Sequence, residues 1–128
     1  MADESVRAWA HELLTRDLEA FDEARRRFLR RPTGKRLHAV RTSSRRVRSL
    51  LEDLSSVIGL HDLDDLRRAI RASGTARDAA VLYKIVNAQL PNEERPFADD
   101  FLKDLRTRQR DFSKKTCTRL KRVHLRIE

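Results

Sequence analysis

Basic side chains recur in one stretch of the sequence at a spacing that would bring them onto one face of a helix. The row consists of Lys35 at its edge, His38, Arg41, Arg45 and Arg48. Steps of three and four residues stack side chains on a helix, here over about 15 Å at the helical rise. Arginine keeps its charge and offers a planar fork that fits two phosphate oxygens. The row therefore predicts binding of a phosphate-rich anion.

This row lies beside the apolar sector of its helix, so it should border a groove between helices. Two neighbours depart from it, since Arg46 falls in another sector and Arg36 falls near the apolar one. His38 lies among arginines, and like charge disfavours its charged form. Two roles for it stay open: hydrogen bonding to phosphate as a neutral ring, or orienting a neighbouring side chain.

A second basic row lies near the end of the chain. It consists of Arg108, Lys115, Arg119, Arg122 and Arg126. If the second and fourth helices are neighbours, the two rows would line one channel that suits a flexible chain of phosphates. A solvated helix face is the alternative for either row. Two rows together favour a binding surface, because the first of them has no intervening acid.

Arg77 and Asp78 form an unusual pair in the third helix. The helical pattern puts Arg77 on the apolar face with Leu66, Ile70 and Val81. An arginine on such a face must be paired or reach a ligand, because an unpaired buried charge is very costly. Gly74, one turn earlier, would let a neighbouring helix approach. Structural and functional roles for the pair are equally open.

Composition and charge favour a polyanion as partner. The 128 residues include 29 Lys and Arg and 20 Asp and Glu, giving a formal net charge of +9. Residues 25–48 hold eleven basic residues and no acid, whereas residues 1–24 hold seven acids and two arginines. Dense like charge opposes folding unless an anion neutralises it. The single cysteine, Cys117, excludes an intrachain disulfide.

The apolar spacing predicts an all-α protein. Three- and four-residue steps predict helices over residues 5–30, 35–58, 62–90 and 96–124. Asp62 would cap the third helix, and Pro96 suits the first turn of the fourth. The short connections predict an antiparallel four-helix bundle that forms a single domain over residues 1–128.

The apolar steps also name the residues expected in the core. They are Val6, Trp9, Leu13, Phe21, Ala24, Phe28, Leu37, Val40, Val47, Leu51, Leu54, Ile58, Leu63, Leu66, Ile70, Val81, Ile85, Phe101, Leu105, Phe112, Leu120 and Val123. No secretory leader and no apolar run of membrane-spanning length is expected. We therefore expect a soluble protein of the cytoplasm.

Two sequence elements resemble the signatures of the CHAD family, the conserved histidine α-helical domain. The first has the pattern His-x-x-Arg-x-x-x-Arg-Arg-x-Arg, here His38, Arg41, Arg45, Arg46 and Arg48. The second has the pattern Gly-x-x-Arg-Asp, here Gly74, Arg77 and Asp78. The likeness covers roughly residues 35–90, and the fourth helix has no sharp motif. Thr42 and Ser43 depart from the small apolar residues typical of the family.

The resemblance implies non-catalytic binding of inorganic polyphosphate, without a metal or cofactor, and association with polyphosphate granules. With the rows, it gives these candidate binding residues: Lys35, His38, Arg41, Arg45, Arg46, Arg48, Arg77, Arg108, Lys115, Arg119 and Arg122. A full CHAD domain resembles two related four-helix halves, and this chain has one copy of each signature. We therefore expect a homodimer that restores the two-fold, full-length arrangement.

Three other functions fit the composition less well. A nucleic-acid backbone would also contact the arginine rows, but no aromatic residue lies in a row to stack bases. An enzyme would need a nucleophile or carboxylate facing the rows. Cys117, near Lys114 and Lys115, lacks a histidine nearby in sequence. A membrane-surface module is disfavoured, because the other helices can cover the apolar face of helix 35–58.

Overall fold

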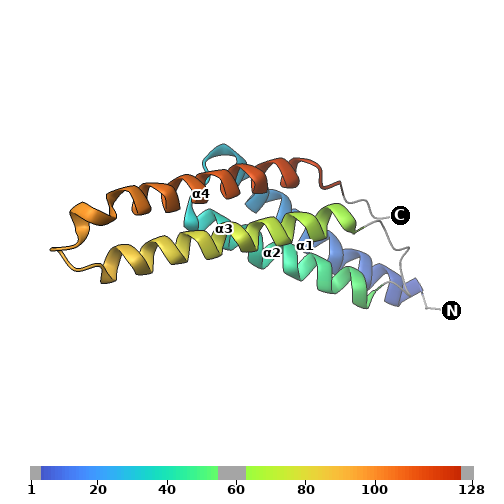
Figure 1. Cartoon of the computed structure of the whole chain (residues 1–128). Helices are drawn as coiled ribbons and strands as arrows, with labels where there is room; N and C mark the ends of the chain where they lie inside the picture. The colour runs from blue at the N-terminus through green and yellow to red at the C-terminus, as the bar shows by residue number, and fades with distance from the viewer. Residues whose placement is uncertain (1–3, 55–62, 125–128) are drawn as a thin grey trace.

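The computed structural model describes residues 4–54 and 63–124 of the chain. Its helices are α1 (Glu4–Arg30), α2 (Gly34–Asp53), α3 (Asp64–Gln89) and α4 (Arg95–Lys121). They run alternately up and down as a four-helix bundle (Figure 1), and the described residues include no strand. The predicted fold class is confirmed.

Local hydrogen bonds set the turn between α1 and α2. Thr33 Oγ1 accepts the backbone N–H of Arg36 at 3.3 Å and so caps the start of α2. The Arg36 guanidinium turns back to the end of α1, where Nη1 donates to the carbonyl oxygens of Arg27 at 2.9 Å and Arg31 at 3.4 Å. Arg36 thus adds a second donor to the Arg27 carbonyl, which also accepts the Arg31 N–H, and supplies a donor to the Arg31 carbonyl beyond the helix end.

The other helix ends differ slightly from the prediction. Leu63 precedes α3 without a side-chain cap, while the predicted cap, Asp62, lies outside the described residues. Helix α2 ends at Asp53, with Leu54 as its C-cap, and so stops before the predicted end at 58. Pro96 lies in the first turn of α4 as predicted. That helix ends at Lys121 and not at 124, because the N–H groups of Arg122 and Val123 bond back to Arg119 and Leu120 in a tight last turn.

Helices adjacent in sequence pack side by side. The most extensive contact joins α3 to α4, followed by α1 with α2 and α2 with α3, while α1 and α4 touch over a short stretch. In the described part of the chain, α2 and α4 have no close backbone approach. They occupy opposite corners of the bundle, so the arrangement in which they are neighbours is wrong.

The core follows the predicted apolar steps through the middle of the bundle. Its largest fully buried side chains include Phe21, Phe28, Leu66 and Leu120. Small polar residues complete the core where α2 and α3 approach each other. Ser44 and Ser73 are buried, and their hydroxyl groups donate to the carbonyl oxygens of Arg41 and Ile70 within their own helices. Their small size lets these two helices approach closely.

Several predicted core residues are exposed instead, and all lie toward helix ends. They are Val6, Trp9, Val81, Ile85 and Phe101. Figure 1 shows that the hairpin of α3 and α4 extends well beyond the turn between α1 and α2. Past that turn no helix covers the apolar face of the hairpin, although apolar residues still recur along α3 and α4 at helical spacing. Leu13, Ile70 and Phe112 are half-buried, and Ile58 lies outside the described residues.

Candidate anion-binding site

The two sequence elements, one on α2 and one on α3, meet where these helices pack. Arg41 of α2 is half-buried, and its Nη1 donates a long hydrogen bond of 3.5 Å to the carbonyl oxygen of Ser73. That carbonyl belongs to the residue before Gly74, so Arg41 reaches the Gly-x-x-Arg-Asp element directly. The arginine is held by a backbone group that leaves most of its donors free.

Gly74 makes room for this guanidinium. A Cβ atom placed on Gly74 would lie 3.4 Å from Arg41 Nη1, and no other neighbouring atom comes within 4 Å. The prediction that Gly74 admits a neighbouring helix therefore needs correction. What lies over the glycine is one arginine side chain, and a side chain longer than alanine would displace it.

Like charges gather around Arg41. Its pKa is lowered by burial, and further by the positive charges of Arg77 and Arg45, while Asp78 opposes the shift. The cause is physical crowding of guanidinium groups in a partly desolvated place. The charges of both sequence elements, on Arg41 and Arg45 of α2 and on Arg77 and Asp78 of α3, are therefore close enough to interact.

One turn along the seam, a pocket of about 230 Å³ extends the same surface. Its lining includes His38 from α2 and both Arg77 and Lys84 from α3. Lys84 was missed by the sequence analysis, because it belongs to neither element and only the packing brings it near His38. We define the α2–α3 basic cluster as His38, Arg41, Arg45, Arg77 and Lys84.

No member of this cluster makes an ion pair within 4.0 Å in the described parts of the chain. Arg77, predicted on the apolar face, is exposed. It shares that face with Val81 as predicted, but both residues are exposed and not buried, because this part of α3 borders the start of α2, where the bundle ends. Arg77 is therefore a solvent-accessible cation beside a half-buried one.

The remaining candidates on α2 are dispersed. Lys35 and Arg46 are exposed, and Arg46 lines a shallow depression together with Arg45, Asp17 and Asp53. Arg48 is half-buried, and its Nε atom is buried without a hydrogen-bond partner among the described residues. Such a donor is costly to leave unsatisfied. Arg46, like Arg45, thus borders a depression that also contains two acids.

The α4 row does not join this cluster. Lys115 and Arg119 line a separate pocket with Arg68 and Arg71 of α3. Arg108 pairs with Asp104 at 3.2 Å. Exposed Arg122 follows the last turn of α4, and Arg126 lies outside the described residues. The single channel between two rows is therefore replaced by two basic surfaces, which flank α3.

Cys117 lies outside the basic surfaces described above. Burial raises the pKa of the Cys117 thiol, and the smaller effect of Lys121 does not reverse this, so the thiol is a poor nucleophile. Residues 4–54 and 63–124 contain no group of three or more metal-binding side chains. None of the described helices is both long and apolar enough to cross a membrane.

Comparison with known proteins gives one match. The family model described as CHAD domain matches residues 3–126. Searches of curated proteins and of solved structures return no match. The family match spans all four helices and contains both basic surfaces.

Proposed function

The chain belongs to the CHAD domain family, and from that premise we propose that it binds inorganic polyphosphate at the α2–α3 basic cluster without catalysing a reaction. The family is associated with polyphosphate-related proteins. One observation supports the choice of surface more than any other: Arg41 lies half-buried against the Gly74 turn of α3, next to Arg45 and Arg77. These cations come from both sequence elements.

The electrostatics of the cluster favour an anion with many charges. Burial and two neighbouring guanidinium groups lower the pKa of Arg41, so the unbound cluster is held together against repulsion. A chain of phosphates neutralises several of these charges at once and accepts paired hydrogen bonds from each guanidinium. Affinity is therefore expected to rise with the number of phosphates and to fall with added salt.

The residues of the cluster have separable roles in this proposal. Arg41 is the fixed donor, since packing over Gly74 limits its motion. Exposed Arg45 and Arg77 grip neighbouring phosphates from either side. His38 and Lys84 extend the contact along the pocket of about 230 Å³. The exposed members add charge at little cost to folding, because they remain hydrated without the ligand.

Isothermal titration of the full chain with phosphate chains of several lengths tests the proposal. The expected affinity increases from short to long chains at constant ionic strength, and long polyphosphate displaces a DNA duplex added at equal charge. Tighter binding of the DNA would favour the nucleic-acid alternative and contradict the proposal. Release of inorganic phosphate during the titration would contradict the absence of catalysis.

We further propose that two copies of the chain associate, as the two-fold arrangement of a full CHAD domain implies. Exposed apolar side chains on the α3–α4 hairpin supply a surface for this contact, chiefly Phe97, Phe101 and Ile85, which are 89%, 52% and 49% exposed. A contiguous apolar patch on a surface marks an interaction site, and these three side chains are the candidates for such a patch. Light scattering should give a dimer for the parent and a monomer for Phe97→Ser with Phe101→Ser. A monomeric parent, with or without polyphosphate, would rule out the association.

A further inference from the structure

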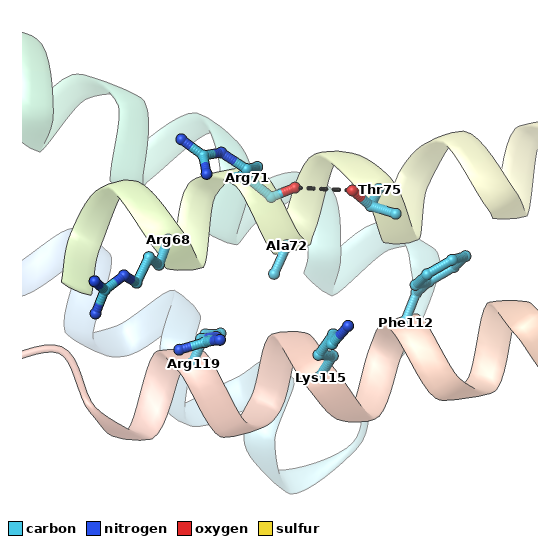
Figure 2. Close-up of a pocket in the computed structure, with 7 residues that line it drawn as sticks. All are labelled: Arg68, Arg71, Ala72, Thr75, Phe112, Lys115 and Arg119. Carbon is cyan, nitrogen blue, oxygen red and sulfur yellow. Dashed lines mark hydrogen bonds between the residues drawn. The ribbon is translucent and has the colours of Figure 1, made fainter. Parts of the chain in front are cut away.

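Arginine and lysine side chains of α3 and α4 converge on the side of α3 that faces away from α2. They line a pocket of about 200 Å³ together with Phe112, Ala72 and Thr75. Figure 2 shows Arg68 extending from α3 toward α4 beside Arg119, with Lys115 directed across the gap. Arg71 borders the pocket, with its guanidinium turned away from α4. Three cations thus share one small space.

The lining of this pocket contains no acidic residue. Lys115 and Arg119 make no ion pair within 4.0 Å among the described residues. Arg68 has Asp65 at 3.7 Å, but both side chains are about half exposed, and such pairs are weak. Three neighbouring positive charges repel one another, and a bound anion would relieve that repulsion.

The pocket also has an apolar wall. Phe112 is half-buried and lies at one end of the pocket, and Ala72 lies on the α3 side. An aromatic face next to cations suits a ligand that carries both phosphate groups and a flat ring, since base stacking on aromatic side chains is favourable. The volume is below the usual range of about 300–1,000 Å³ for small-molecule sites. It therefore suits a compact anion and not a polymer.

We propose that the α3–α4 pocket is a second anion site, independent of the α2–α3 basic cluster, which takes a compact oligophosphate group. Arg68, Lys115 and Arg119 hold the phosphates. Inorganic triphosphate and a nucleoside triphosphate share this chemistry. The two surfaces lie on different sides of α3, where Gly74 faces α2 and Ala72 faces α4. One ligand can therefore bind while the other is present.

The test is titration of two charge-matched variants with sodium tripolyphosphate and with long-chain polyphosphate at fixed ionic strength. Lys115→Gln with Arg119→Gln should weaken triphosphate binding at least roughly tenfold, since two charge-assisted contacts to the phosphates are lost. Long-chain binding should change less than about threefold. Arg41→Gln with Arg45→Gln should give the reverse pattern. Circular dichroism checks that both variants remain helical.

Two results would overturn the second site. One is the absence of triphosphate binding by the parent, and the other is an equal loss in both variants, which would indicate non-specific attraction to net charge. Failure of long-chain binding alone would overturn the proposed function and leave the second site intact.

The source of the oligophosphate is decided by Phe112→Leu. A loss confined to adenosine triphosphate assigns the site to a nucleotide, whereas an unchanged affinity for both triphosphates assigns it to the inorganic anion. Either result supports the oligophosphate site itself.

Discussion

Arginines at the end of α1 and arginines along α2 are close in sequence but lie in opposite surroundings. Arg25, Arg26 and Arg27 pair with Asp22 or Glu23 on their own helix. Arg41 and Arg45 have no acid within 4.0 Å among the described residues. The residue type is the same, so it is the surroundings that separate the paired arginines from those proposed to bind the ligand.

Arg25 shows what a structural arginine does in this bundle. Its Nη1 donates to the carbonyl oxygens of Val123 at 2.6 Å and Leu120 at 3.3 Å, at the end of α4. Its guanidinium also lies 5.2 Å from the centre of the Phe21 ring. Those contacts tie α1 to α4, where the two helices otherwise touch little. With the bond from Nη2 to Asp22, three hydrogen bonds thus hold the Arg25 guanidinium within the protein.

The largest expected effect comes from removing the arginines of α2 that have no acidic partner. Arg41→Ala with Arg45→Ala should weaken binding of long polyphosphate by roughly 100-fold or more, because two charge-assisted contacts are lost. The helix content should persist, since neither side chain belongs to the core. Titration calorimetry and circular dichroism measure the two quantities. Unchanged affinity would show that the ligand uses another surface.

The next largest effect concerns Arg25, one of the paired arginines of α1. Arg25→Ala should lower the free energy of unfolding by about 1–3 kcal/mol, because the carbonyl groups of the α4 end lose a charged donor. Polyphosphate affinity should stay within about twofold, since additivity holds for separate sites. Urea denaturation gives the stability. A large loss of affinity with little change in stability would reverse the assignment of structural and binding arginines.

A smaller effect tests how Arg41 is positioned. Gly74→Ala should stabilise α3 by about 0.5–1 kcal/mol, because glycine is unfavourable within a helix. The new Cβ atom would meet Arg41 Nη1 at 3.4 Å, an ordinary contact, so affinity should be kept. Gly74→Leu should displace the guanidinium and weaken binding while the protein still folds. If both variants bind equally well, the glycine has no part in positioning Arg41.

The smallest effect is a pH dependence in the paired region. The hydrogen bond from Arg27 and the charge of Arg26 lower the pKa of Glu23 below its ordinary value of 4.5. A depressed carboxyl pKa contributes stability above the ordinary value, and that contribution is lost as the pH falls through the folded-state pKa. NMR titration should place the Glu23 midpoint below 4.5, and Arg27→Gln should raise it. A midpoint at or above the ordinary value would show that these pairs do not persist in solution.

The sequence predicts the helices well, because the apolar steps and the break at Pro32 and Gly34 act locally. It also gives Arg41, Arg45 and Arg77 as candidate binding residues, through the two elements that carry the family resemblance, but their proximity follows only from the packing of α2 on α3. It misses Lys84, because that residue enters the cluster only when α3 packs on α2. Arg68 and Arg71 are missed because they belong to neither basic row and come near Lys115 and Arg119 only when α3 packs on α4.

Apolar residues are predicted wrongly as core where the helical spacing continues along a helix but no neighbouring helix covers that face. Val81 and Phe101 keep the helical spacing of core residues, yet they are 42% and 52% exposed on the α3–α4 hairpin. The supposed meeting of the α2 and α4 rows fails for a related reason. A helical wheel gives the faces of one helix, but which helices are neighbours depends on the packing of the whole bundle.

The most direct test of the account observes the guanidinium groups themselves. NMR spectra of the arginine side chains should be recorded while long-chain polyphosphate is added to the full chain. The account predicts large shifts for Arg41, Arg45 and Arg77 and almost none for Arg26 and Arg27. Shifts spread evenly over all of these arginines, or largest for those of α1, would contradict it.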